Sequence, residues 1–503
     1  MFDAWIHKTY RDLGLLFLLF FVVLGTSYAF LLPPFLVPDE RRHWLAAHHH
    51  LAKLATGNGT VCSTDVALDR HFMKMRVKFR PGRKVPSDIF SRVKKLTPEC
   101  EERLLYKGGN PLSYPGVLLS RLFVPREPDS GTQSLYAFYC ARLLHGLLIA
   151  LLLFRLWWLA RTSASTGPAG MLTLLLFSLS PLFVQQSFGI TIDVVSNAFA
   201  LALCVWMVFS DRLAWFDYVT LLALGSITVL GRPVLLAVLP PMMALGFYLG
   251  RVRRNPGGAT SLTGTIREEF ARRKQLVAVV LVIMVAGAIY TLINAPAWAK
   301  GSDIVAHLEF LIAHPSHGFQ TIGGRLANLF LHPSFFLDYL GYLDTRLSSA
   351  TLRDFGALAV LVAIIEAIGI WRGIARLVRD HARRREILPV LRTVAVLATL
   401  AFAAIGLSIL LIGFLAYTWS PLTTQRLPNL QPRYLFPHLV VTVGIGMAIA
   451  RTLLEPLGEP TPRPSKGARR AWHFAEVALV CLFAAGLLSF ISHLSIDILA
   501  RYS

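Results

Sequence analysis

The sequence predicts an all-α fold, a polytopic transmembrane helical bundle with about eleven spans and a long external first loop. Only 16% of its 503 residues are charged and 54% are hydrophobic, whereas about a quarter of a soluble chain is charged. The apolar residues form runs of roughly 18 to 25, long enough to cross about 30 Å of hydrocarbon as helices. The sequence lacks the alternating segments of about ten residues that are typical of a membrane β-barrel.

The expected spans end where each apolar run gives way to polar residues. We place them at 13–36, 134–160, 169–188, 194–210, 215–231, 233–250, 276–297, 356–371, 390–417, 434–450 and 473–497. The first run has no small-residue cleavage site followed by a soluble domain, so we interpret it as a retained span and not as a signal peptide. The chain then divides into an N-terminus with the first span (1–36), an external loop region with an interfacial helix (37–133), a transmembrane bundle (134–297), a second external loop (298–355) and C-terminal spans (356–503).

The basic residues predict the orientation of the chain. The net charge is +21, and most Lys and Arg residues lie in short loops between apolar runs, for example Arg251, Arg253 and Arg254. Such loops stay in the cytoplasm. This gives a cytoplasmic N-terminus, an external C-terminus and a multi-pass protein of the cell inner (cytoplasmic) membrane, surrounded by membrane lipid. Because topology accounts for the charge, we do not expect nucleic acid as a partner.

Two of the five cysteines, Cys62 and Cys100, lie outside the expected spans and in the same external region. An oxidising compartment favours a disulfide between them, and two unpaired thiols are the alternative. The remaining three lie in spans, where they are interpreted as small packing residues.

Asp39 and Glu40 follow the first span at the point where the chain leaves the hydrocarbon, and His43 begins a stretch, 43–54, that is typical of an interfacial amphipathic helix. Partial desolvation raises the pKa of a carboxyl group and improves it as a general base. The alternative is a charged border that ends the span. The three consecutive histidines at 48–50 point around a helix and do not converge, so no metal is expected there.

Three further polar clusters fall on the same side of the membrane. Asp193 and Asn197 share a helical face because they are four residues apart, and Asp193 is also placed to cap the fourth span; both roles stay open. Arg232, at the turn before the sixth span, runs against the orientation bias, although snorkelling also explains it. Arg433 precedes Tyr434 at the border of the tenth span, and its planar guanidinium suits phosphate.

Arg142 and His145, one turn apart in the second span, are expected to join the same polar pocket. Paired carboxylates and several arginines at one face indicate an inverting sugar transfer, in which a base deprotonates the acceptor hydroxyl and cations stabilise the departing phosphate. A donor sugar on a lipid phosphate has its headgroup at this depth. Arginine neutralises the leaving group, so no cofactor or metal is required. The chain has no P-loop, Rossmann glycine pattern or CxxC pair, which argues against an ATP-driven pump.

Several short motifs resemble, in this order, those of a large family of bacterial multispanning proteins that is similar to glycosyltransferases of the C superfold. They are Pro38-Asp39-Glu40 with His43, Asn110-Pro111-Leu112-Ser113-Tyr114, Arg142-Leu143-Leu144, Asp193 with Asn197, Arg232-Pro233, and Arg433-Tyr434-Leu435-Phe436-Pro437, and the resemblance covers roughly residues 13–450. It implies a polyprenyl-phosphate sugar donor and a cell-envelope glycan, lipid or protein acceptor. Asp39 would be the base and Glu40 its substitute, and the other motif residues would bind substrate. Arg41, Arg42 and the basic first loop depart from the family pattern.

Two other functions are compatible with the sequence. A transporter or flippase of a lipid-linked or anionic solute would have broken helices near the bilayer midplane and pseudo-symmetric halves. A non-catalytic membrane assembly subunit would use the basic first loop to dock an acidic partner. Its signature would be an external cavity plugged by side chains, with Asp39 in an internal salt bridge.

Overall fold

The computed structural model describes most of the chain. The described residues are 2–37, 39–47, 61–74, 88–101, 114–120, 122–124, 130–161, 170–254, short pieces between 263 and 289, 304–331, 339–340, 345–379, 381–418, 420–425, 427, 430–454 and 466–502. Pro38, the histidines at 48–50, Asn110 and most of the expected span 276–297 lie outside these ranges.

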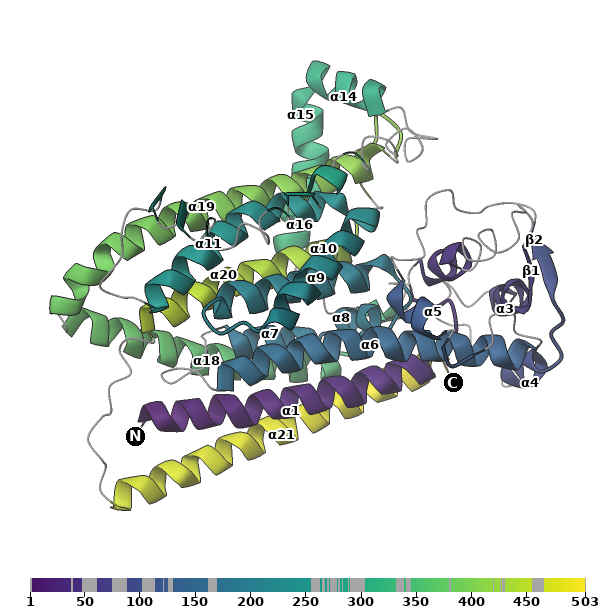
Figure 1. The fold of residues 1–503 in the computed structure, drawn as a ribbon. Helices are drawn as coiled ribbons and strands as arrows, with labels where there is room; N and C mark the ends of the chain where they lie inside the picture. Colours follow the sequence, from purple (N-terminus) through teal and green to yellow (C-terminus); the bar gives the residue numbers. More distant parts are fainter. Residues whose placement is uncertain are drawn as a thin grey trace.

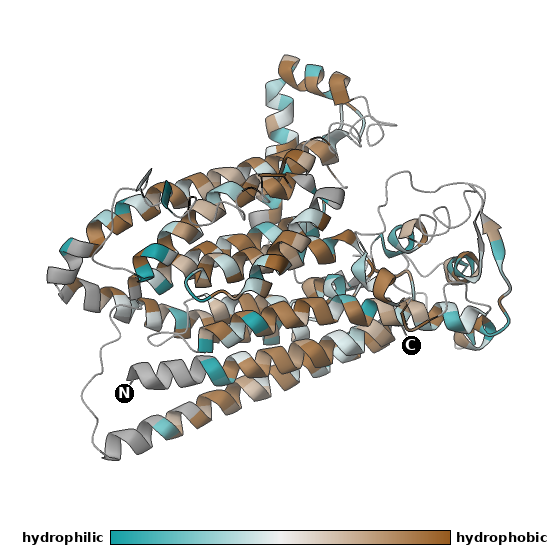
Figure 2. Ribbon diagram, in the orientation of Figure 1, coloured by the Kyte–Doolittle hydropathy of each residue, from teal (hydrophilic) through white to brown (hydrophobic). Residues whose placement is uncertain are grey.

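The described part of the chain is dominated by long apolar helices that pack side by side (Figure 1), and eight of its helices are long and apolar enough to cross a membrane. They belong to α1 (Phe2–Leu31), α6 (Gly131–Arg161), α9 (Ile192–Phe209), α11 (Leu239–Arg254), α18 (Ser349–Arg379), α19 (His381–Thr418), α20 (Phe436–Leu454) and α21 (Lys466–Tyr502). Their middle parts are hydrophobic over several turns (Figure 2). The two chain termini lie at opposite ends of the bundle (Figure 1).

Three expected spans are not among these eight helices. The span 169–188 is broken into α7 (Met171–Ser178) and α8 (Pro181–Ser187), so the prediction of one continuous helix there was wrong. Pro181 has no N–H to continue a helix and disfavours helical dihedrals at the residue before it. Ser180 accordingly is extended, with φ −58° and ψ 137°.

The other two expected spans have different outcomes. The fifth forms a helix with the predicted bounds, α10 (Trp215–Gly231), which at 17 residues is just below the length taken to cross a membrane. The seventh, 276–297, falls mostly outside the described residues. A helical membrane bundle is therefore established, whereas the count of eleven spans stays a prediction.

A small region with its own sheet lies at the end of the bundle where the C-terminus is found (Figure 1). It contains β1 (Val61–Ser63), α3 (Thr64–Met73), α4 (Ile89–Val93), β2 (Glu99–Glu101) and α5 (Pro115–Ser120). We call this end of the bundle the loop end, and the end where α1 begins the N-terminal end. The helix that starts at Glu40 is described to residue 47, so the rest of the predicted interfacial helix is outside the described residues.

The sheet of the loop end joins the two external cysteines. Strands β1 and β2 are antiparallel, and Cys62 lies directly opposite Cys100. Cys100 is disulfide-bonded. The other three cysteines, Cys140, Cys204 and Cys481, are free thiols. This register is compatible with the predicted disulfide between Cys62 and Cys100, which stays a prediction.

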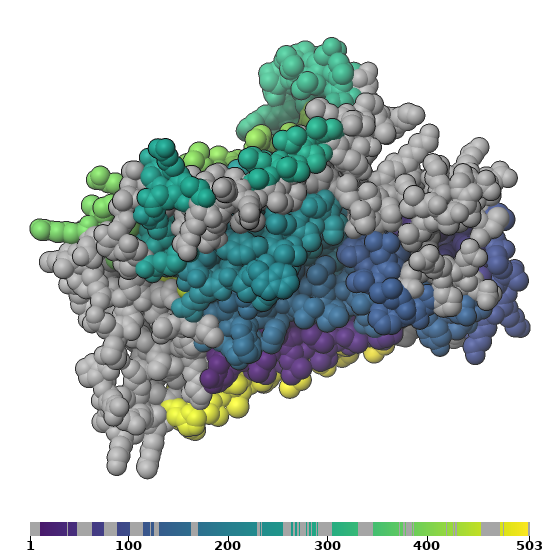
Figure 3. Space-filling view, in the orientation of Figure 1, coloured from purple at the N-terminus to yellow at the C-terminus, as the bar shows by residue number. Residues whose placement is uncertain are grey.

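The remaining short elements lie before α11, between α11 and α18, and before α20. They comprise η2 (Pro233–Val238) before α11, α14 (Ile304–Ala313), α15 (Pro315–Gly318), the π-helical η4 (Phe319–Gly323), α16 (Gly324–Leu331), the paired strands β3 (Tyr339–Leu340) and β4 (Thr345–Arg346), and η5 (Pro432–Leu435) before α20. In the space-filling view, α14 and α15 form a lobe that projects from the bundle (Figure 3).

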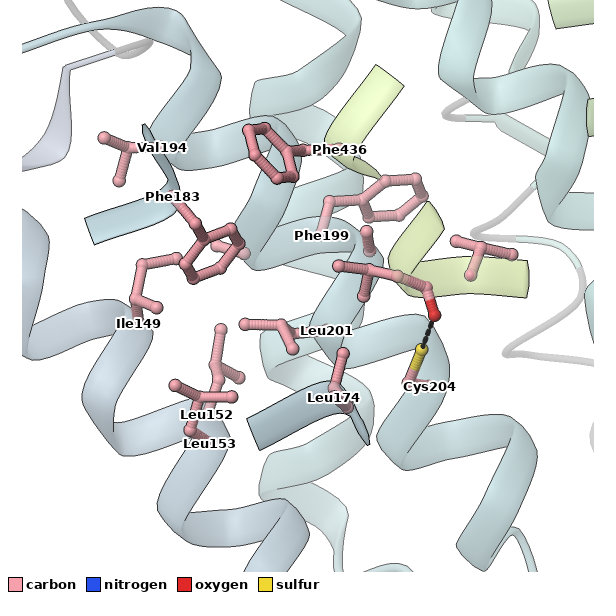
Figure 4. Close-up of a cluster of buried hydrophobic side chains, with 14 of the residues drawn as sticks. Ile149, Leu152, Leu153, Leu174, Phe183, Val194, Phe199, Leu201, Cys204 and Phe436 are labelled. Atoms are coloured by element: carbon pink, nitrogen blue, oxygen red, sulfur yellow. Dashed lines mark hydrogen bonds between the residues drawn. The ribbon is translucent and has the colours of Figure 1, made fainter. Parts of the chain in front are cut away.

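Helix α9 is the centre of the bundle. In its most apolar window 94% of the residues are buried, against 18% in α21. The core around it includes Ile149 and Leu153 of α6 and Phe199 and Leu201 of α9 (Figure 4). Cys204 donates a hydrogen bond of 3.1 Å from its thiol to the carbonyl of Val440 in α20. The most buried helix is therefore the one that carries Asp193 and Asn197.

Candidate functional site

The candidate site lies where α9, η2 and η5 begin at the loop end. Asp193 is in the first turn of α9, and its carboxylate accepts a hydrogen bond from Nη2 of Arg232, the residue that precedes η2. Nε of Arg433, in η5, lies 3.6 Å from Oδ2 of the same carboxylate. The side chains of Asp193 and Arg433 are 3% and 2% exposed. One buried carboxylate thus joins arginines from two other segments.

Asp39 reaches this cluster from the segment that follows α1. Its Oδ2 accepts a hydrogen bond from Nη2 of Arg433, and its Oδ1 lies 3.9 Å from Nη1 of Arg42. The Asp39 side chain is 27% exposed. Arg433 therefore bridges a buried carboxylate, Asp193, and a solvent-accessible one, Asp39.

Tyr434 completes the cluster through its aromatic ring. The guanidinium carbons of Arg232 and Arg433 lie 4.5 Å and 5.1 Å from the ring centroid. The Tyr434 hydroxyl also accepts a hydrogen bond of 3.3 Å from Nη2 of Arg433. A ring face attracts cations within about 6 Å, so Tyr434 holds the two guanidinium groups near each other despite their like charge.

The backbone at Asp39 has φ +62°, in the left-handed region. Aspartate tolerates this region better than most residues. The Asp39 carbonyl accepts the backbone N–H of His43, which closes the first turn of the helix that follows. The side chain pairs with Arg433, so the carboxylate meets an arginine almost four hundred residues away in sequence (|i−j| = 394).

The charges around Asp39 decide its protonation. Burial by itself would raise the pKa of Asp39, but the adjacent Arg433 guanidinium, together with Arg42, holds it below its ordinary value. The expectation of a raised pKa was therefore wrong, because ion pairing outweighs desolvation. In the arrangement described, Asp39 is ionised at neutral pH.

Glu40, next to Asp39, belongs to a different and fully buried network. Its carboxylate accepts two hydrogen bonds from Arg142 of α6, 2.8 Å from Nε and 2.7 Å from Nη2. It also accepts the backbone N–H groups of Phe35, at 3.0 Å, and Ile190, at 3.1 Å. The Glu40 and Arg142 side chains are 0% and 1% exposed.

Arg142 uses its remaining N–H groups to close the end of α1. Nη1 donates to the carbonyls of Ala29, at 2.9 Å, and Leu32, at 2.5 Å, and Nη2 donates to that of Pro33, at 3.1 Å. The last carbonyls of a helix have no partner within it. Glu40 and Arg142 thus hold this junction together, and their expected roles as substitute base and substrate contact stay predictions.

The turn between α8 and α9 is fixed at three successive residues. The Phe188 ring fills the space beside two glycines, since a Cβ atom would come within 1.8 Å of it at Gly25 and 2.1 Å at Gly146. The Gly189 carbonyl lies 2.9 Å from Nδ1 of His145, and the Ile190 N–H donates to Glu40. His145 therefore holds the turn that positions Asp193 and does not join the charged cluster.

His43 and Tyr114 meet beside the cluster. Nδ1 of His43 lies 2.6 Å from the Tyr114 hydroxyl. Burial lowers the pKa of His43 to about 4, although the nearby carboxylate of Asp39 opposes this. His43 is therefore neutral at pH 7. Asn110, expected to accompany Tyr114, lies outside the described residues.

Asn197 lies one turn below Asp193 and is 0% exposed. Within the described part of the chain, neither its side-chain oxygen nor its nitrogen has a hydrogen-bond partner. The same is true of Gln186 in α8, which is also 0% exposed. The sequence analysis missed Gln186, although an amide in an apolar run is costly at membrane depth and was a usable signal.

The cluster offers carboxylates and guanidinium groups and no set of metal ligands. Among the residues described, no group of three or more His, Cys, Asp or Glu side chains is placed to hold a metal ion. No protein-family model matches the chain, and no curated protein and no solved structure matches it.

Proposed function

We propose that this protein is an integral membrane glycosyltransferase. It would move a sugar, with inversion, from a polyprenyl-phosphate donor to a cell-envelope acceptor at the external face. The observation that carries the proposal is the ion pair of Asp39 with Arg433, within reach of the Asp193–Arg232 pair. This arrangement supports the proposal because an accessible carboxylate lies beside two guanidinium groups at one end of a membrane bundle.

The two arginines are suited to a lipid phosphate. Each guanidinium presents several N–H donors in a plane that matches phosphate oxygens, and Tyr434 lies under both. A phosphate binding there competes with Asp39 for Arg433. Because Arg433 holds the pKa of Asp39 down, this exchange raises the pKa of Asp39 and frees its carboxylate to act as a base.

In the proposed reaction Asp39 takes the proton of the acceptor hydroxyl while the acceptor oxygen attacks the anomeric carbon of the sugar. The bond from that carbon to the phosphate oxygen breaks, and the lipid phosphate leaves with the electron pair. Arg433 and Arg232 stabilise the charge that builds on the leaving oxygen. Asp193 keeps both arginines in place, and Asp39 ends protonated.

The test combines transfer and lipid binding. We expect Asp39→Asn to be expressed and to retain lipid phosphate, but to lose sugar transfer by about 100-fold or more because the base is gone. Arg433→Ala should lose both sugar transfer and the co-purifying lipid phosphate, the latter measured by mass spectrometry. Asp88→Asn, an exposed acid of the loop end, is the matched control. Transfer that survives Asp39→Asn removes Asp39 from the role.

A non-catalytic membrane assembly subunit is the second candidate, and the same ion pair favours it. Asp39 in a salt bridge to Arg433 is one of the two features that such a subunit would have. In that case wild-type protein carries no lipid phosphate, transfers no sugar, and uses Arg433 only to hold Asp39. Mass spectrometry of the purified wild type therefore separates the two functions.

The break between α7 and α8 bears on the transporter alternative. Interrupted helices line substrate sites in many transporters, and Pro181 produces such an interruption here. The ionisable side chains, however, gather at the start of α9 and not at the break. Uptake of a lipid-linked sugar into proteoliposomes that depends on Pro181, and not on Asp39, would favour transport.

A further inference from the structure

Two buried carboxamides lie beside the charged cluster without hydrogen-bond partners. They are Gln186 of α8 and Asn197 of α9, both 0% exposed, and in each of them both the oxygen and the nitrogen lack a partner within the described residues. The hydroxyls of Ser187 and Thr191, between them in sequence, are also buried and without partners in that part of the chain. Thr191 precedes α9 as its N-cap residue, yet its side chain makes no capping hydrogen bond.

Contacts of neighbouring residues connect the segments of both carboxamides to those of the arginines. Gln186 is one helical turn from Phe183, whose ring lies 5.7 Å from that of Phe436, directly after η5 (Figure 4). Asn197 shares a face of α9 with Asp193, which pairs with Arg232. The turn that joins the two helices is fixed by Phe188 and its neighbours. Asn197 therefore lies further into the bundle than the Asp193–Arg232 pair, and Gln186 lies in the last turn of the helix that leads to α9.

The neighbouring Glu40–Arg142 network, by contrast, is fully hydrogen-bonded. Leaving a buried polar atom without a partner is costly, whereas an apolar side chain of similar size avoids that cost. A carboxamide offers both donors and an acceptor, and a hydroxyl offers one donor and accepts as well. This set matches the paired donors and acceptors of sugar hydroxyls and carries no charge.

We propose that Gln186 and Asn197, with Ser187 and Thr191, bind an uncharged, hydroxyl-rich sugar ring. The proposal rests on the proposed function and adds its substrate class: the phosphate of the donor lies on Arg232 and Arg433, and the neutral sugar lies on the bundle side of them. The two parts of the donor are thus recognised by different side chains.

The test compares one lipid with and without a sugar. Purified protein in nanodiscs is titrated with undecaprenyl phosphate and with the same lipid carrying glucose, galactose, mannose or arabinose. We expect at least one glycosylated lipid to bind about tenfold more tightly than the bare lipid. Gln186→Leu and Asn197→Leu should abolish this advantage and leave the affinity for bare undecaprenyl phosphate unchanged. Gln320→Leu, an exposed carboxamide in η4, is the control.

The unfolding temperature without ligand separates binding from a structural role. If the carboxamides serve the ligand, each leucine variant keeps or raises the wild-type unfolding temperature, because an unpartnered polar group has been removed. A clear decrease in both variants overturns the proposal, since it shows that the amides stabilise the fold.

The failures of the two proposals are distinguishable. If bare undecaprenyl phosphate binds and no attached sugar improves its affinity, the sugar site is wrong and the phosphate site stands. The sugar site is also wrong if the advantage survives both leucine substitutions. If neither bare nor glycosylated lipid binds, both the sugar site and the transferase proposal are overturned.

Discussion

The same three helices end in two charged clusters, one at each end, that differ in how completely their charges are paired. At the loop end Asp193 lies with Arg232 and Arg433, and at the N-terminal end Asp211 lies with Arg253 and Arg451. The loop-end cluster takes one residue from the beginning of each of three segments: α9, η2 with α11, and η5 with α20. The N-terminal cluster takes one residue at or near the end of each of the same segments. These segments therefore run parallel.

The N-terminal cluster is saturated. Both Asp211 oxygens accept from Arg451, at 2.8 Å and 2.9 Å. Arg253 donates from Nε to Thr452, at 2.8 Å, and from Nη2 to the Ala448 carbonyl, at 2.9 Å. The hydrogen bond and charge of Arg451 overcome the effect of burial and hold the pKa of Asp211 below its ordinary value. We call such a cluster, in which the charged groups are fully paired and hold helices together, a latch.

The loop-end cluster contains polar groups whose hydrogen-bonding capacity is not fully used. Within the described residues, Nη1 of Arg232 has no hydrogen-bond partner. The Asn197 side chain, one helical turn from Asp193, has none either. The Asp39 carboxylate is accessible and shares Arg433 with Asp193. Residue types alone do not distinguish a latch from a site, whereas the completeness of their hydrogen bonding does.

The distance between the two clusters fits a membrane. Helix α9 is 18 residues long, which corresponds to a rise of about 27 Å. The hydrocarbon core of a bilayer is about 30 Å thick. The two charged clusters therefore lie at the two borders of the hydrocarbon, where charge is least costly.

The largest predicted difference concerns stability. Asp211→Ala leaves the buried Arg451 and Arg253 without their carboxylate, and we expect a loss of about 3–5 kcal/mol. Asp193→Ala should cost less than half as much, because Arg433 keeps Asp39 and Tyr434. Unfolding temperatures in one detergent measure both. Equal losses would mean that the loop-end cluster is also a latch.

The next difference concerns ligand binding. At about 100 times its dissociation constant a ligand stabilises a protein by about 2.7 kcal/mol, and we expect undecaprenyl phosphate to do so for the wild type. Arg433→Lys should remove most of this gain, because lysine lacks the planar fork. Arg451→Lys should lower the starting stability and keep the gain. If both variants lose the stabilisation by undecaprenyl phosphate equally, the ligand does not distinguish the loop-end cluster from the N-terminal one.

The smallest difference concerns pH. The pKa of His43 is about 4 in the folded protein and about 6.5 when unfolded. The unfolded chain therefore binds more protons between these values, so stability falls as the pH decreases from 6.5 to 4, by at most about 1.4 kcal/mol per pH unit. His43→Gln should flatten this slope of the unfolding temperature. An unchanged slope would assign the pH dependence to other groups.

The sequence predicted the long helices well, because length and apolar composition determine them. The bounds of α10 were correct, whereas the break at Pro181 was missed because the run 169–188 as a whole is long and apolar enough for one span. Asp39, Asp193, Arg232 and Arg433 were identified as ionisable residues at a membrane border, and the fold brings them together.

The roles within that group were not predictable from sequence. Asp39 has a left-handed backbone conformation directly before the helix that starts at Glu40, and its side chain faces Arg433 while that of Glu40 faces Arg142. The position of a residue relative to the apolar runs indicates how deep its side chain lies in the membrane. It does not indicate the partner of that side chain, which comes from a segment distant in sequence. The sequence signals Gln186 as a polar residue in an apolar run, but its lack of a partner is visible only once its neighbours are in place.

The disulfide has a consequence for when the site is completed. Cys100 ties β2 to β1, and β1 leads directly into α3. In α3, Asp69 accepts a hydrogen bond of 2.6 Å from Nε of Arg41, two residues after Asp39. A newly made chain that has not met an oxidising compartment lacks this brace on the helix that follows Asp39. Reduction of the Cys100 disulfide is therefore expected to loosen the segment that positions Asp39.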